Sequence, residues 1–139
     1  MYTAPGKGFL QVVGILYVIF SGFGILVGLL GMAGTVAIGA SPGISTWMFM
    51  LFFVVLLFSS GYGLFLGIVG IAHCNNLSKA DFVRTCGLVD LLIRSLVAFF
   101  GAGMGIPLAF SGLVLSILFL VGASKNATAA ASMPGTTMD

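Results

Sequence analysis

The stretch SGFGILVGLLG, from Ser21 to Gly31, is written a second time as SGYGLFLGIVG, from Ser60 to Gly70. The serine and all four glycines match position for position. The pattern differs from a dinucleotide-binding fingerprint, because its first three glycines are spaced G-x-G-x-x-x-G inside an apolar run. Glycines four residues apart lie instead on one face of a helix. The repeat therefore predicts two helices, each with a face of small residues.

The composition around the repeat indicates a lipid environment. The chain has 139 residues, of which 60% are hydrophobic and 6% are charged, and it contains no glutamate. Its mean hydropathy is +1.25. A soluble domain carries about 25% charged residues, so this chain lacks the side chains for a water-facing surface. We predict an integral membrane protein with the lipid bilayer as its main partner and no nucleic-acid partner.

The apolar runs predict four crossings. A helix needs about 20 residues to cross about 30 Å of hydrocarbon, and two uncharged runs are longer than that. A third run, from Phe82 to Ala123, is too long for one span, and the stretch GAGMGIP divides it. We therefore predict an all-α fold, a single membrane domain built as a four-transmembrane-helix bundle, with helices near 9–32, 46–72, 83–104 and 107–123 and a short tail at 124–139.

The cations predict the orientation. Four crossings place Lys7, Lys79, Arg84 and Lys125 on one side of the membrane, whereas the loops 33–45 and 105–106 hold no charge. Lysine and arginine flanking a span concentrate on the cytoplasmic side. We expect a multi-pass protein of the cell membrane with both termini cytoplasmic.

Two alternatives compete with this topology. In the first, an amphipathic cytoplasmic helix runs to Arg94, and a single kinked span follows from Ser95 to Ala123. That arrangement leaves three glycines and a proline in the middle of one span and exports Lys125. In the second, the first helix is a signal peptide cleaved near AIGAS, but the helix is longer than the apolar core of such signals. Four crossings fit better.

The small residues predict how the helices pack. Lipid provides no hydrophobic drive between helices, so they associate by close backbone approach across small residues. Two interpretations remain open: packing within one bundle, and self-association between chains. Because the first two helices run in opposite directions, the repeats resemble a small inverted repeat with its copies near opposite membrane faces. The predicted packing residues are Gly24, Gly28 and Gly31 in the first helix and Ser59, Gly63 and Gly67 in the second.

One pair of charges falls inside a predicted span. Asp90 and Arg94 lie four residues apart in the third helix, with the acid nearer its N-terminus, which is the favourable order for an ion pair. Ionisable residues inside a membrane usually face protein or water and mark functional sites. Two roles stay open. Arg94 can extend back toward Asp90 and the headgroups as an anchor, or the pair can line a polar pathway or bind a partner.

Other chemical groups are sparse. His73, Cys74 and Cys86 lie near one another in the topology, but their spacing matches no zinc motif. A Ser/His or paired-carboxylate catalyst would need partners that this chain lacks. The glycosylation sequons at Asn76 and Asn126 fall on the cytoplasmic side, where no glycan is expected. We expect no enzyme, no catalytic residue, no cofactor and no bound metal.

The opening MYTAPGKGFLQVVGILYVIFSG and the four-span plan resemble small, uncharacterised membrane proteins of Gram-positive anaerobic bacteria. The resemblance covers most of the chain and implies no activity or site residue. Two function classes follow from the residues themselves. The first is a non-enzymatic scaffold or accessory subunit that packs with itself, as a homo-oligomer, or with a larger membrane protein. The alternative is a small oligomeric channel or transporter with Asp90 and Arg94 in its pathway.

Overall fold

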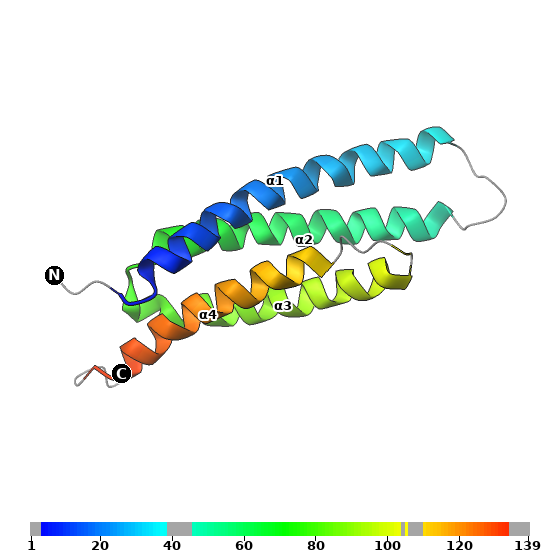
Figure 1. The fold of residues 1–139 in the computed structure, drawn as a ribbon. Helices are drawn as coiled ribbons and strands as arrows, with labels where there is room; N and C mark the ends of the chain where they lie inside the picture. The colour runs from blue at the N-terminus through cyan, green and yellow to red at the C-terminus, as the bar shows by residue number, and fades with distance from the viewer. Residues whose placement is uncertain (1–3, 39–45, 104, 106–109, 134–139) are drawn as a thin grey trace.

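The computed structural model describes residues 4–38, 46–103, 105 and 110–133, and this part of the chain is helical with no strand (Figure 1). Four of its helices are long and apolar enough to cross a membrane. A short 3-10 helix, η1, precedes the third of them. The helices are α1 (Lys7–Ile38), α2 (Thr46–His73), η1 (Leu77–Lys79), α3 (Ala80–Gly103) and α4 (Ser111–Ala131).

The helices form a bundle of two antiparallel hairpins (Figure 1). The most extensive contacts join α1 to α2 and α3 to α4, while α2 also packs on α3 and α1 on α4. The chain enters α1 and leaves α4 at the same end of the bundle, where the amide N of Gly6 donates to Asn126 Oδ1 at 2.7 Å. The direction of the chain therefore alternates from helix to helix.

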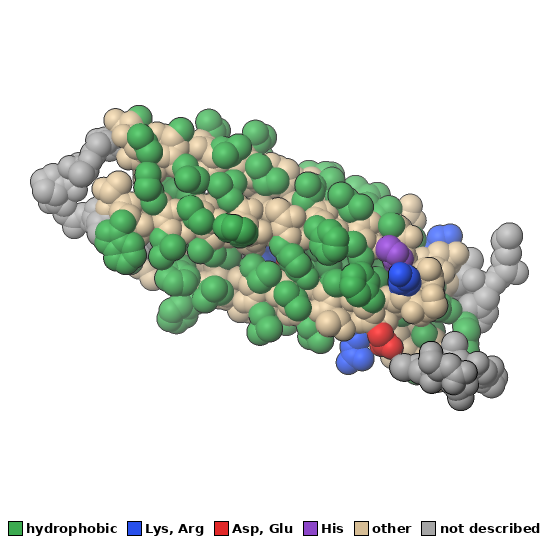
Figure 2. Space-filling model, turned by 180° about the vertical axis from the view of Figure 1, so that it is seen from behind, with side chains coloured by type: hydrophobic (Ala, Val, Ile, Leu, Met, Phe, Trp, Pro, Cys, Tyr) green, Lys and Arg blue, Asp and Glu red, His purple; other side chains and the backbone are tan. Residues whose placement is uncertain are grey.

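The bundle is apolar outside and partly polar inside. Large hydrophobic side chains cover the exterior, with Phe58 and Phe99 each 77% exposed (Figure 2). Most of the charged side chains visible on the face shown in Figure 2 gather at one end of the bundle. The interior combines aromatic and aliphatic groups with polar ones, which is the arrangement that lipid favours. The buried polar or charged residues are Ser21, Ser59, Ser60, Asp90, Ser116 and Asn126.

The structure corrects several helix boundaries. Helix α1 continues to Ile38 instead of ending near residue 32, and α3 begins at Ala80 instead of 83. Helix α4 begins at Ser111 and continues to Ala131, so residues 124–131, half of the tail expected at 124–139, belong to that helix. The reason is that hydropathy marks where a helix leaves lipid, whereas alanines such as those at 129–131 continue a helix in water as well. Residues 104, 107–109 and 134–139 of the predicted elements lie outside the described part.

The three-crossing alternative is wrong for the described chain. Helices α3 and α4 are separate and lie side by side in opposite directions (Figure 1). Gly105, in the connection between them, has a φ of 72°, a conformation that glycine adopts without strain. A single span from Ser95 to Ala123 is therefore excluded.

Candidate functional site

The two copies of the glycine repeat contact each other at their first halves. A Cβ atom on Gly24 of α1 would lie within 3.0 Å of Ser60 Oγ on α2. A Cβ atom on Gly63 of α2 would lie 2.5 Å from Ser21 Oγ on α1. Ser60 and Gly63 occupy in the second copy the positions of Ser21 and Gly24 in the first, so the contact is reciprocal. The repeat is therefore the surface on which α1 and α2 cross.

Beyond the crossing, the copies diverge along their antiparallel helices. Gly28 and Gly31 face side chains of Leu57 and Phe53, and Gly70 faces Phe119 of α4. The starts of the copies lie side by side, and the later glycines lie in opposite directions from that contact along the two helices (Figure 1). The remaining predicted packing residue of α2, Ser59, is buried, whereas its neighbour Ser60 makes the contact with Gly24.

Among the described glycines of this hairpin, the closest approach to the backbone of the other helix joins Gly67 to Gly14, which is not one of the predicted packing residues. A Cβ atom on Gly67 would lie 2.8 Å from the carbonyl oxygen of Gly14. By contrast, Gly22 and Gly61, the second residues of the two copies, have no atom within 4 Å of their Cβ positions. One glycine of each copy therefore faces away from the bundle, and the other three face a neighbouring helix.

Asp90 is the centre of a polar cluster that we define as Tyr17, Asp90, Arg94 and Ser116. Its side chain is 0% exposed. Its Oδ2 atom accepts hydrogen bonds from the Tyr17 hydroxyl at 2.5 Å and from Ser116 Oγ at 2.5 Å. These donors belong to α1 and α4, so one carboxylate oxygen of α3 links three helices.

Arg94 completes the cluster and brings in the fourth helix. Its Nε donates to Asp90 Oδ2 at 2.9 Å, and its guanidinium carbon lies 4.9 Å from the centre of the Tyr17 ring. The guanidinium group fits between two glycines, Gly63 of α2 and Gly112 of α4, whose Cβ positions would each fall within 3.0 Å of an Arg94 nitrogen. The guanidinium group has room there only because both residues are glycines and lack a side chain.

The cluster lies deep in the bundle. Asp90 is ten residues after Ala80, the first residue of α3, which places it about 15 Å along that helix. The Arg94 side chain is 14% exposed. Arg94 extends back to Asp90, and its guanidinium lies inside the bundle against Gly63, Gly112 and the Tyr17 ring. Both roles considered above, an anchor and a pathway or partner site, remain predictions.

Two buried oxygens in this region lack a hydrogen-bond partner within the described residues. They are Asp90 Oδ1 and Ser21 Oγ. The Ser21 oxygen and an Arg94 nitrogen both lie within 3.0 Å of the Cβ position of Gly63, so the serine borders the guanidinium. Buried polar atoms are costly in lipid unless they are paired. These two oxygens are therefore the positions at which a proton or a water molecule would supply the missing hydrogen bond.

A second polar contact closes the end of the bundle that carries the chain ends. Asn126 accepts from the Gly6 amide and donates through Nδ2 to the carbonyl oxygen of Cys74 at 3.0 Å. It is 3% exposed, so the asparagine of this sequon is enclosed in the fold. His73 contacts the carbonyl of Val69 in its own helix at 3.2 Å, and no three His, Cys, Asp or Glu side chains group together in the described ranges.

Sequence reasoning identified Asp90 and Arg94 but not their partners. Tyr17 and Ser116 are 73 and 26 residues away from Asp90. The available signals were weak: a tyrosine within an apolar helix, and the spacing of Gly112 and Ser116 by four residues, which puts them on one helix face.

Known proteins offer no template for this cluster. Comparisons with models of protein families, with curated proteins and with solved structures find no match to this chain.

Proposed function

We propose that this protein is a non-enzymatic membrane scaffold or accessory subunit that associates with further copies of itself or with a larger membrane protein. The observation that carries the proposal is the enclosure of Asp90, whose side chain is 0% exposed and bonded to three neighbours. A channel or carrier needs its ionisable group to reach water. Here each transport cycle would first have to separate Asp90 from Arg94, Tyr17 and Ser116.

The exterior supports association with other membrane segments. It is apolar, and Gly22 and Gly61 leave open positions on α1 and α2. Helices in lipid approach most closely at such small residues. We place both termini in the cytoplasm, because Lys7, Lys79 and Lys125 all belong to the end of the bundle where the chain enters and leaves.

The test compares Asp90→Ala with the double variant Asp90→Ala/Arg94→Leu. The single change leaves a buried cation without its partner, which destabilises by about 3–5 kcal/mol, and the double change removes that cation. We expect thermal unfolding in one mild detergent to shift down for the single variant and to recover in the double variant. Liposomes containing the parent should show no flux of protons, potassium or chloride above protein-free liposomes.

The second candidate is a small channel or carrier. It is favoured by the unpartnered Asp90 Oδ1 and Ser21 Oγ, which offer acceptor sites beside the guanidinium. This candidate replaces the scaffold if the parent conducts an ion in liposomes and the well-folded double variant does not. Recovery of stability without any flux in the parent supports the scaffold.

A further inference from the structure

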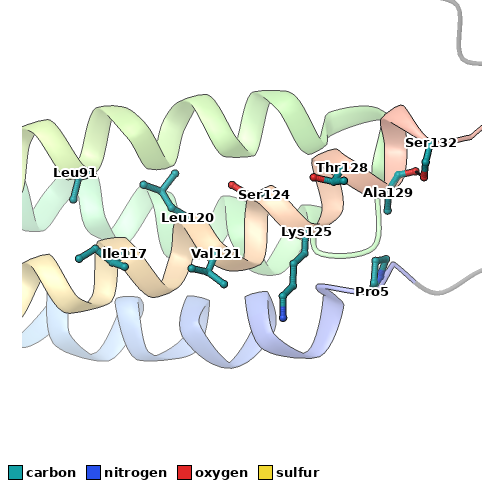
Figure 3. Close-up of a pocket in the computed structure, with 10 residues that line it drawn as sticks. All are labelled: Pro5, Leu91, Ile117, Leu120, Val121, Ser124, Lys125, Thr128, Ala129 and Ser132. Carbon is teal, nitrogen blue, oxygen red and sulfur yellow. Dashed lines mark hydrogen bonds between the residues drawn. The ribbon is translucent and has the colours of Figure 1, made fainter.

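A groove runs along the outer surface of α4. Its volume is about 820 Å³, and one face of α4 forms its floor, with a residue of α3 on one side and Pro5 on the other (Figure 3). The α4 residues recur every three or four positions, as one face of a helix does. They are Ile117, Leu120, Val121, Ser124, Lys125, Thr128 and Ala129, and Ser132 follows directly after the helix.

The groove changes character along its length. Toward the middle of the bundle it is lined by Leu91, Ile117, Leu120 and Val121, which are all apolar. Toward the end that holds the chain ends it is lined by hydroxyl groups and by Lys125, the one charged side chain among the ten described residues that line it. Figure 3 shows the lysine reaching from α4 toward α1. Its Nζ lies 5.9 Å from the centre of the Phe9 ring of α1, a contact that holds the cation at the α1 side of the groove.

The length of the apolar part matches one leaflet of a bilayer. Lys125 is eight residues after Ile117, which corresponds to about 12 Å along α4. One leaflet contributes about 15 Å of hydrocarbon. The lysine lies at the level where α1 begins, because the adjacent Asn126 accepts from the Gly6 amide. The cation is therefore at headgroup depth when the apolar part is in the acyl-chain region.

We propose that this groove, the α4 groove, binds one anionic diacyl phospholipid, with its phosphate at Lys125 and the Ser124 and Thr128 hydroxyls and an acyl chain along Ile117 to Val121. Lys125 is the one charged side chain among the described residues that line the groove, and a cation at this depth attracts a negatively charged headgroup. Hydroxyl groups add hydrogen-bond donors for phosphate oxygens. The proposal requires membrane insertion but not the scaffold role, and lipid binding and ion flux are measured separately.

The experiment counts lipids bound to the purified full chain by native mass spectrometry. The chain in neutral detergent is titrated with phosphatidylglycerol or with phosphatidylcholine of the same acyl chains. We expect tighter binding of phosphatidylglycerol. Lys125→Gln, which keeps a polar side chain and removes the charge, should weaken that binding about fivefold, as expected for one basic residue at an anionic surface. Lys79→Gln, an exposed cation of η1 outside the groove, should leave it unchanged.

A second pair of variants tests the apolar part. Val121→Trp fills the groove, whereas Val114→Trp enlarges another exposed valine of α4 that does not line it. We expect only the first to reduce phosphatidylglycerol binding. Equal affinity of the parent for the two lipids overturns the proposal, as do equal losses in both lysine variants. Unchanged binding in Val121→Trp overturns it as well, because the headgroup would then bind without the groove.

Discussion

At the scale of single residues, the fold depends on how one carboxylate is satisfied. Asp90 Oδ2 receives donors from Tyr17, Arg94 and Ser116, and the Tyr17 hydroxyl and Ser116 Oγ also lie 2.9 Å apart. A charged group in lipid is stable only when it is paired and hydrogen-bonded. Each partner therefore contributes mainly by preventing an unsatisfied buried charge. The free-energy cost of leaving that charge unsatisfied exceeds the net contribution of an ordinary surface hydrogen bond.

Ser116→Ala tests this dependence. It removes one donor to a buried carboxylate, and we expect a loss of about 1.5–3 kcal/mol in the free energy of unfolding. Ser95→Ala is the matched control, because Ser95 is also a helical serine but is exposed and bonds to the Leu91 carbonyl of its own helix. The control should change stability by less than about 0.5 kcal/mol. Equal losses in the two variants, measured by reversible unfolding in one detergent, would show that Ser116 does not stabilise Asp90.

At the scale of helices, the α1–α2 hairpin is defined by glycine contacts. Gly14 and Gly67 face each other so closely that a Cβ atom on Gly14 would lie 3.0 Å from the Gly67 carbonyl oxygen. Close approach lengthens the surface over which two helices make van der Waals contacts, and these contacts drive helix association in lipid. The spacing of α1 and α2 is therefore set where both helices lack a side chain.

Gly67→Ala tests this spacing. The added methyl group would meet the backbone of Gly14, which has no rotamer to relieve the clash, so we expect a loss of about 1–3 kcal/mol. Gly61→Ala lies in the same helix with open space around its Cβ position, and it should be neutral or stabilising by up to about 1 kcal/mol, because alanine favours a helix over glycine. Thermal unfolding of both variants in one detergent decides the matter. If Gly67→Ala is as stable as Gly61→Ala, α1 and α2 are further apart than the structure places them.

At the scale of the whole molecule, the two hairpins are joined at two levels. The polar cluster links them deep in the bundle, and Asn126 links the start of α1, the end of α2 and α4 at one end. Ala4 adds a contact at the same end, since its amide donates to Asn75 Oδ1 at 3.3 Å. The chain ends and the α2–α3 connection thus share one side of the bundle, whichever side of the membrane that is.

Reporter domains test the arrangement and its orientation together. We expect reporters fused after Asp139 and inserted within Asn75–Ser78 to be cytoplasmic, because the flanking cations belong to that end. A reporter at Ser41, between α1 and α2, should be external. The arrangement is contradicted if the first two reporters lie on different sides, whereas a reversal of all three contradicts only the orientation.

Much of this architecture could be predicted from the sequence. With 6% charged residues, the chain is suited to lipid, where helices are the simplest way to form all backbone hydrogen bonds. The lengths of the apolar runs and the GAGMGIP interruption predicted four such helices. The order of charges in α3 identified Asp90 and Arg94 as a pair. These features are local, because each depends on composition or on residues a few positions apart.

The tertiary structure alone decided which residues meet that pair. Tyr17, Ser116 and the glycines at 63 and 112 reach Asp90 and Arg94 only through the rotation and relative height of four helices. In an apolar sequence, every face of a helix is compatible with lipid, so hydrophobic periodicity does not reveal which face points inward. The close contacts of small and polar side chains choose that face, and those contacts exist only once the helices are packed.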